Sequence, residues 1–209
     1  MKSFLKTCAN FAALLMVLPA YFFYRLGGLA IGPDKVFPGW SQLFSLLPGL
    51  TGVTLRRAFY RLVLPQCEAD CCISFGTTFS HPTARIGRAV YVGLYCSIGD
   101  VTLEDDVLIS SNVSILNGGN QHGIARLDIP VREQPGVYTH VTIGRDSWIG
   151  DRAIVMADVG RHCVVGAASL VTKPVPDFAV VVGAPARIVG SRKPTESGER
   201  IPQPSVGAN

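Results

Sequence analysis

IGRAVYVGLYCSIGDVTLEDDVLISSNVSI, residues 86–115, places a small aliphatic residue at every sixth position, often followed by Gly. The repeated positions, with a shift of one residue after the third of them, are Ile86, Val92, Ile98, Leu103, Ile109 and Ile115. A fixed short period is typical of a solenoid, in which each repeat packs against the next. We therefore predict a stack of short strands whose aliphatic residues point into a narrow core.

A second tract of the same kind begins after residue 140. Its repeated positions are Ile143, Ile149, Val155, Val165 and Val171. Gly and other small residues between these positions suit the tight corners that join one strand to the next. Three hexapeptide faces make one triangular coil, so the chain is predicted to be mainly β. An ordinary β-sandwich is the alternative, but it predicts period-two alternation with turns about every 8–12 residues.

The N-terminal part of the chain is unusually apolar. Hydrophobic residues make up 48% of the 209 residues, and charged residues make up only 16%. Residues 7–24 contain no charge, follow Lys2 and Lys6, and end before Arg25. This run is long enough to enter a bilayer core, and we predict that it is a helix. A second uncharged run, residues 36–55, is interrupted by Pro and Gly and is not expected to span comfortably.

Three interpretations of this apolar front remain open. The first is a cleaved secretory signal, although no small-x-small cleavage site follows cleanly. The second is a hairpin anchor that dips into one leaflet, with Arg56, Arg57 and Arg61 at the lipid phosphates. The third is the apolar collar of a soluble trimer. We favour the anchor, and we therefore expect membrane association through residues 1–64 on the cytoplasmic side of a bacterial inner membrane.

Charge and cysteine usage narrow the classes of partner. The net charge is +4, and most of the local surplus flanks the apolar runs, so anionic lipid headgroups are a simpler partner than nucleic acid. No Lys/Arg tract is interleaved with aromatic residues, and no nucleic acid partner is expected. The six cysteines lack the paired C-x2-C spacing of zinc sites, which predicts free thiols, a reducing compartment and no metal.

These features divide the chain into three parts. We predict a hydrophobic helical anchor with a basic connector over residues 1–72, a coil domain over 73–190 and a flexible tail over 191–209. The coil domain is interrupted at residues 117–140, which contain the pairs Gly118-Gly119 and Pro135-Gly136 and only scattered apolar positions. A loop of this length inside a compact domain is usually functional.

The interrupting loop carries the residues best suited to catalysis. His122 and Glu133 place an imidazole and a carboxylate on one excursion. A neutral imidazole can take a proton from a hydroxyl at physiological pH, and a carboxylate can orient it or support the resulting cation. A lone loop His is more often a solvated surface residue. His140, at the far end of the loop, is an alternative base, while His81 and His162 are expected to be structural or solvated.

Residues 141–189 resemble the C-terminal coils of the hexapeptide-repeat acyltransferases. The most specific pieces are Trp148-Ile149-Gly150, the run Val165 to Ser169, Thr172-Lys173-x-Val175-Pro176, and the closing Gly183-Ala184-Pro185-Ala186-Arg187. This family includes maltose, galactoside and serine acetyltransferases, and the resemblance covers roughly residues 73–190. It implies a left-handed parallel β-helix, a homotrimer and acetyl-CoA as the acyl donor, bound along the groove between neighbouring coils.

The resemblance also implies roles for particular residues. His122 is implied as the general base for direct attack of an acceptor hydroxyl on the thioester, without an acyl-enzyme. Glu133 resembles the supporting carboxylate, and Asn112 resembles the acceptor-site Asn. The main chain of Gly150, Ala167 and Ala168 is implied to contact the pantetheine arm. Contacts to the adenosine phosphates are implied for Thr172, Lys173 and Arg187.

Trp148 has two possible roles, and Ala168 departs from the family pattern. Trp148 either lines the acceptor or cofactor groove or serves as a packing anchor at a coil corner. Ala168 stands where the family has Gly before Ser169, a departure that is expected to tighten the groove.

The acceptor is less well defined than the donor. Residues 41–61 resemble the leader of a subgroup associated with bacterial cell-surface polysaccharide assembly, which implies a sugar, glycan or lipid-linked glycan acceptor. Another small-molecule or protein acceptor and a non-catalytic, membrane-tethered trimeric scaffold are the alternatives. The same β-helix carries γ-type carbonic anhydrases, but three interfacial histidine ligands cannot be placed with confidence among the four histidines, so a metal hydratase is the least favoured reading.

Overall fold

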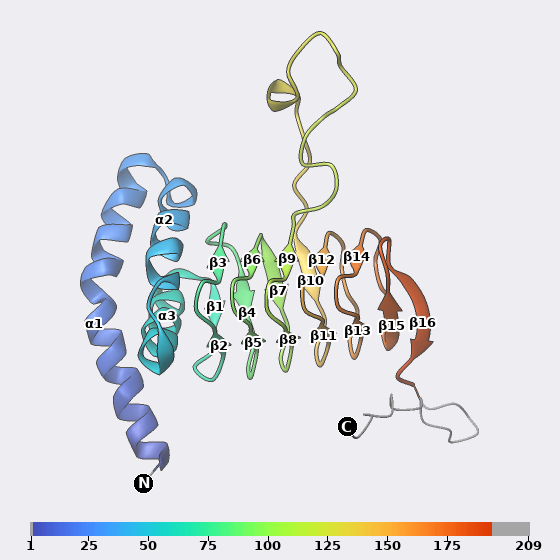
Figure 1. Ribbon diagram of the computed structural model, residues 1–209. Coiled ribbons are helices and arrows are strands. Elements are labelled where there is room, and N and C mark those ends of the chain that lie inside the picture. Colours follow the sequence, from blue (N-terminus) through green and yellow to red (C-terminus); the bar gives the residue numbers. More distant parts are fainter. Residues whose placement is uncertain (1, 194–209) are drawn as a thin grey trace.

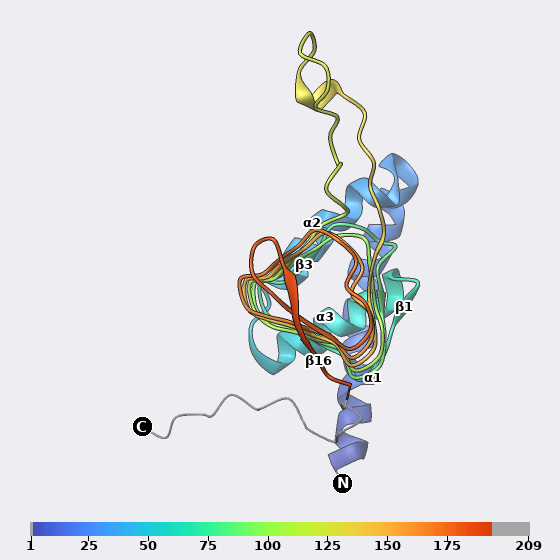
Figure 2. The same cartoon turned by 90° about the vertical axis from the view of Figure 1, so that its right-hand side faces the viewer.

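Two- to five-residue strands separated by tight turns build the centre of the chain. The computed structural model describes residues 2–193, with side chains from residue 8 onward. The strands form three sheets that are the three faces of one coil, and every strand pair inside the coil is parallel. Figure 2 shows the triangular outline along the coil axis. The predicted left-handed parallel β-helix is confirmed.

Each sheet takes one strand from each successive coil. Sheet A contains β1 (Gln66–Cys67), β4 (Arg85–Ile86), β7 (Val101–Leu103) and β10 (Val141–Ile143). Sheet B contains β2 (Cys72–Ile73), β5 (Tyr91–Val92), β8 (Leu108–Ile109), β11 (Trp148–Ile149), β13 (Val164–Val165), β15 (Ala179–Val182) and β16 (Arg187–Ser191). Sheet C contains β3 (Thr78–Phe79), β6 (Ser97–Ile98), β9 (Ser114–Ile115), β12 (Ile154–Val155) and β14 (Leu170–Val171). β16 pairs antiparallel with β15 at the C-terminal end of the coil.

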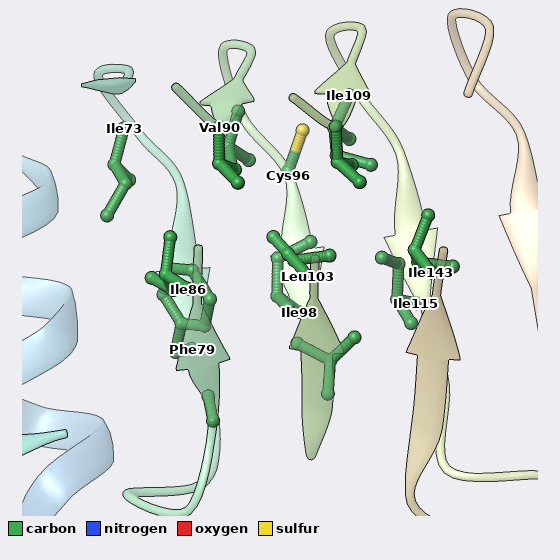
Figure 3. Close-up of a cluster of buried hydrophobic side chains, with 14 of the residues drawn as sticks. Ile73, Phe79, Ile86, Val90, Cys96, Ile98, Leu103, Ile109, Ile115 and Ile143 are labelled. Carbon is green, nitrogen blue, oxygen red and sulfur yellow. The ribbon is translucent and has the colours of Figure 1, made fainter. Parts of the chain in front are cut away.

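The repeated aliphatic residues form the core. The second residue of most strands points inward, so equivalent residues stack from coil to coil, as Ile73, Val92 and Ile109 do in sheet B. Figure 3 shows these layers side by side. Every repeated position identified in the sequence is buried. Burial of each such side chain stabilises the fold by about 1.5–3 kcal/mol, which explains why each strand keeps an aliphatic residue at its inward position.

Three helices cover the N-terminal end of the coil, and we call them the helical cap. They are α1 (Lys2–Ile31), α2 (Pro33–Ser45) and α3 (Gly49–Val63). Figure 1 shows α1 outermost, with α2 and α3 between it and the first strands. Pro33 begins α2 at a position where its missing N–H is not needed. The second apolar run of the sequence is therefore divided between α2 and α3 rather than forming one span.

A buried hydroxyl joins the helical cap to the coil. The Ser41 Oγ atom lies 2.7 Å from the Tyr60 hydroxyl and accepts the backbone N–H of Phe79 at 2.8 Å. The Tyr60 ring packs edge-on against Phe79, with 5.1 Å between ring centroids. Burial raises the pKa of Tyr60 well above its usual range. The cap and the first coil therefore share one core.

The expectation that Arg56, Arg57 and Arg61 lie together at lipid phosphates is wrong for the first two. Arg56 is completely buried, and its guanidinium donates to the carbonyls of Phe44, Ser45 and Leu47 and to that of Ile73. Arg57 is also buried and donates to the Cys71 carbonyl and the Asn10 side chain. The reason is that the last carbonyls of α2 have no helical partner and need donors from elsewhere. Arg61 alone of the three is exposed.

Between β1 and β16, the described chain makes one long excursion from the coil, between β9 and β10. The excursion projects far from the coil in both views (Figures 1 and 2) and contains one short 3-10 helix, Val131–Glu133. At the other end of the chain, β16 continues through Ser191. Residues 194–209 of the predicted tail lie outside the described residues.

Candidate active site

Apart from Trp148, the predicted site residues fall into three groups within one chain. One group lies at the corner where sheet B turns into sheet C, a second at the C-terminal end of the coil, and a third on the projecting loop. The loop leaves from a different corner, where sheet C turns into sheet A. Each group has its own local geometry.

Asn112, Gly150, Ala167 and Ala168 lie in one column at the corner between sheets B and C. Successive turns bond directly, because the N–H of Ala168 donates to the Asp151 carbonyl at 2.8 Å and that of Gly150 donates to Val165 at 2.7 Å. The Asn112 amide reaches the Asp151 carboxylate at 3.4 Å. The structure therefore brings these four predicted residues together along one edge.

Gly150 and Ala168 are small residues in this column for different physical reasons. A Cβ atom at Gly150 would lie 2.5 Å from the Ala167 nitrogen, so stacking of the next coil excludes a side chain there. Ala168 has a φ of 55°, in the left-handed region that favours Gly. Asn112 (φ 58°) and Arg152 (φ 58°) have the same backbone conformation in neighbouring coils. A residue other than Gly at position 168 is therefore not exceptional, because residues with side chains adopt the same backbone conformation at this corner in the neighbouring coils.

Trp148 lies on the outer surface of sheet B. Its side chain is about half exposed, at 47%, and the indole N–H donates to the Ser110 hydroxyl at 2.9 Å. Trp148 does not line the hollow described next. Both sequence interpretations, groove lining and packing anchor, stay open at this position.

Thr172, Lys173 and Arg187 line one open hollow of about 450 Å³ at the C-terminal end of the coil. The first two residues belong to the turn after β14, and Arg187 begins β16. Lys173 and Arg187 are exposed. Two cations and a hydroxyl on one concave surface form a suitable site for phosphate groups.

His122 and Glu133 lie on the loop and are both exposed. Glu133 forms an ion pair with its neighbour Arg132, with 3.5 Å between Nη2 and Oε1. Among the contacts of the described side chains, none joins His122 to Glu133 or to Asn112. One chain therefore does not assemble the implied base, carboxylate and acceptor-site Asn into a single site.

Two buried amides that sequence reasoning missed give the loop its shape. Gln134 is buried, accepts the Arg126 N–H at 3.0 Å, and donates to the Arg126 carbonyl at 2.7 Å. Asn117 is buried at the loop base and donates to the carbonyls of Asp100 and Thr139, both at 3.0 Å. An Asn or Gln inside a polar loop gives no sequence signal, because the same residues are equally common in solvent-exposed turns.

The loop base also contains an imidazole–carboxylate pair. His140 Nδ1 lies 3.0 Å from Asp100 Oδ2. Burial raises the pKa of Asp100, but hydrogen bonds from Thr83 and His140 outweigh this effect and hold the pKa below its usual value. A second pair, His162 and Asp146, is joined at 2.9 Å, and the His162 ring stacks on Phe178. Among the described residues, no three His, Cys, Asp or Glu side chains converge on a possible metal position.

Comparison with known proteins identifies related chains. A family model described as the hexapeptide repeat of succinyl-transferase matches residues 140–173. A putative lipopolysaccharide biosynthesis O-acetyl transferase of Escherichia coli is 30% identical, and the match covers 66% of this chain and 83% of that protein. The galactoside O-acetyltransferase of E. coli is 34% identical, over 50% of this chain and 52% of its own length.

Other relatives and solved structures match this chain over different fractions of their length. The chain spans about half or less of the length of several curated relatives that it matches, including a probable acetyltransferase and several serine acetyltransferases. A hexapeptide-repeat-containing acetyltransferase of Vibrio cholerae, crystallised with acetyl coenzyme A, shares the fold with a TM-score of 0.64. That structure is 23% identical and covers 77% of this chain, while 87% of its own chain is matched.

Proposed function

Since this chain belongs to the hexapeptide-repeat acyltransferase family, we propose that it moves an acetyl group from acetyl-CoA to a hydroxyl of a sugar or glycan. The observation that carries this proposal is the hollow that gathers Thr172, Lys173 and Arg187. The sequence resemblance implied these residues as phosphate contacts, and they share one concave surface. The names of the two E. coli relatives, which transfer acetyl groups to oxygen, support the same reaction class.

The proposed reaction is a direct transfer. His122 accepts the proton of the acceptor hydroxyl while the hydroxyl oxygen bonds to the acetyl carbon. The carbon–sulfur bond of the thioester then breaks. The imidazolium returns the proton to the leaving thiolate, so the reaction yields an acetyl ester and free coenzyme A. The oxyanion formed on the way needs a hydrogen-bond donor, and the Asn112 amide supplies one.

A homotrimer would bring the three groups of residues together. The loop with His122 leaves from the corner between sheets C and A, and Asn112 lies at the corner between sheets B and C. A loop of 24 residues, 117–140, that stands away from its own coil is long enough to reach a neighbour's corner. We propose that each active site combines the loop of one copy with the Asn112 column of the next.

The experiment that tests the function measures thiol release from acetyl-CoA. The purified full chain, in detergent, is offered a panel of free sugars, oligosaccharides and lipid-linked glycans. Release that depends on the acceptor, with an acetyl ester found on the sugar, supports the proposal and identifies the acceptor class. Absence of release with every acceptor, together with absence of coenzyme A binding, would favour the scaffold alternative.

Lys173→Ala is expected to raise the KM for acetyl-CoA about tenfold, with a smaller change in kcat, because one charge-assisted phosphate contact is lost. The difference from wild type should shrink as salt is added, since exposed charges are screened. Lys193→Ala is the matched control, because Lys193 is also exposed but lies against Phe178. Equal KM values for the two variants would remove Lys173 from the cofactor site.

We further propose that α1 contacts a membrane. α1 contains a segment, Cys8–Ile31, with a mean hydropathy of 1.6, a length and composition that spans and signal sequences share. Its inner face, with Ala13, Val17 and Tyr24, is buried against the rest of the helical cap. The exposed apolar residues that repeat on its opposite face are Phe11, Leu15, Leu18, Phe22, Leu26 and Leu29.

We propose that α1 lies in the plane of the membrane surface. One face of α1 packs against α2 and α3, and Asn10 accepts a hydrogen bond from Arg57 at 2.7 Å, so the surface that α1 can offer to lipid is its outer face. A helix with one apolar face free and the other buried suits the interface of a single leaflet.

Phe22→Ala is expected to weaken binding to vesicles of phosphatidylethanolamine and phosphatidylglycerol about tenfold, because one large apolar side chain no longer enters the leaflet. Co-flotation with the vesicles measures this binding. Leu127→Ala removes an apolar residue of the distant loop that is even more exposed than Phe22, and this variant should bind like wild type. If both variants float like wild type, the outer face of α1 is not the lipid contact.

A further inference from the structure

A second hydroxyl–imidazole–carboxylate arrangement lies at the loop base, apart from His122. Asp100 Oδ2 is 3.0 Å from His140 Nδ1, and His140 Nε2 is 2.8 Å from the Thr102 hydroxyl. An ionised carboxylate only accepts hydrogen bonds, so in the neutral ring Nδ1 carries the proton and donates it to Asp100. His140 Nε2 is then an acceptor, and the Thr102 hydroxyl points its proton at a base.

The surrounding backbone holds these three groups in place. The Asp100 carboxylate also accepts the Thr83 hydroxyl at 2.6 Å. The buried Asn117 side chain accepts the Asp100 N–H at 3.1 Å and bonds the Asp100 carbonyl. Thr102 lies on β7, in the middle of sheet A. The hydroxyl is therefore on a strand inside the sheet, and the orienting carboxylate is in the bend just before that strand, where these hydrogen bonds hold it.

Thr102 also lines a hollow with room for a small molecule. The hollow has a volume of about 430 Å³ and includes Gln66, Arg145 and Arg161 among its lining residues. Arg145 pairs with Asp105 at 3.2 Å and Arg161 with Glu104 at 3.3 Å, and both carboxylates line the same hollow. A guanidinium has five N–H donors, so each arginine keeps donors for a developing negative charge on a bound molecule.

We propose that Thr102 is an acyl-accepting nucleophile, activated by His140 and Asp100, that takes the acyl group of small activated esters bound in this hollow. The Thr102 oxygen bonds to the acyl carbon while its proton passes to His140 Nε2. The bond to the leaving group breaks, and the leaving group takes its proton from the imidazolium or departs as an anion. Thr102 then carries an acyl ester, and Asp100 acts as a positioning residue for the ring.

This inference does not depend on the proposed sugar transfer, and the chain offers a matched control. Thr142 on β10 is the cross-strand neighbour of Thr102 and is similarly half-buried. Among the described side chains, no imidazole lies within hydrogen-bond distance of its hydroxyl. Two threonines on one sheet thus differ in whether a base faces the hydroxyl.

The test uses p-nitrophenyl acetate with the purified full chain. We expect a burst of one equivalent of p-nitrophenolate and a mass increase of one acetyl group on the peptide containing Thr102. Thr102→Val should abolish the burst and the label, whereas Thr142→Val should keep both. His140→Gln should slow the burst about 100-fold, the usual contribution of a general base. Thr102→Val should also retain acetyl-CoA-dependent transfer to sugar, which separates this site from the proposed function.

The role of Asp100 is tested by two substitutions. Asp100→Asn should slow the burst, because the ring is then no longer held with its Nδ1–H toward a carboxylate, and Asp100→Glu, which keeps a carboxylate, should restore part of the rate. His81, on the turn before β4, also acts electrostatically on Asp100, and Arg85 on β4 is the cross-strand neighbour of Thr102; both are left unchanged. A burst that survives in Thr102→Val, or a label that falls on lysines or on His140 alone, would overturn the proposal. A loss of the label in Thr142→Val equal to that in Thr102→Val would also contradict it.

Discussion

Replacing His122 by alanine is expected to lower kcat for acetyl transfer at least about 100-fold, because the acceptor hydroxyl then has no base to take its proton. Binding of acetyl-CoA should be unchanged, since the implied phosphate contacts belong to the turn after β14 and to β16 and not to the loop. The measurement is thiol release with the best acceptor of the panel, together with coenzyme A affinity by calorimetry. A loss of kcat without a loss of affinity is the signature of a group that acts only during the reaction.

Two further variants separate a catalytic role from a disturbance of the loop. Leu127→Ala changes another exposed side chain of the same loop and should retain full activity. Glu133→Gln should cost less than His122→Ala, because a supporting carboxylate acts through the imidazole. If His122→Ala turns over like wild type while His140→Gln does not, the base is His140, which Asp100 already orients.

Replacing Arg56 by alanine is expected to lower the free energy of unfolding by roughly 3–5 kcal/mol, the range seen when one partner of a buried charged interaction is removed. Four carbonyls, those of Phe44, Ser45, Leu47 and Ile73, would lose a donor in a place that water reaches poorly. Burial lowers the pKa of Arg56, but a guanidinium stays protonated at neutral pH. Urea denaturation followed by circular dichroism in detergent measures the effect.

Another arginine of the same helix, Arg61, supplies the control for Arg56. Arg61→Ala removes an exposed arginine of α3 and should change the free energy of unfolding by less than about 0.5 kcal/mol. Arg56→Lys keeps the charge but loses the planar fork that reaches several carbonyls at once, so it should fall between the two. Equal urea midpoints for Arg56→Ala and Arg61→Ala would show that the buried contacts contribute nothing to stability.

The coil could be predicted from residues 86–115 and 143–171, because a narrow triangular core admits one aliphatic side chain per strand. That constraint is written directly into the sequence as a six-residue period. The projecting loop could be predicted for the same reason, since a segment that lacks the period cannot join the stack. Phosphate contacts by Lys173 and Arg187 were implied by resemblance, whereas their shared hollow depends on β16, which returns antiparallel along β15.

The helical cap and the loop base depended on contacts between residues far apart in the chain. Arg56 and Arg61 belong to one basic run, yet only the approach of the α2 carbonyls makes the first a buried donor and leaves the second in solvent. His140 is 38 residues from Thr102, and nothing in either segment indicates that they meet. Periodic burial is a local property that the sequence carries, whereas the partner of a polar side chain is set by whatever the folded chain brings beside it.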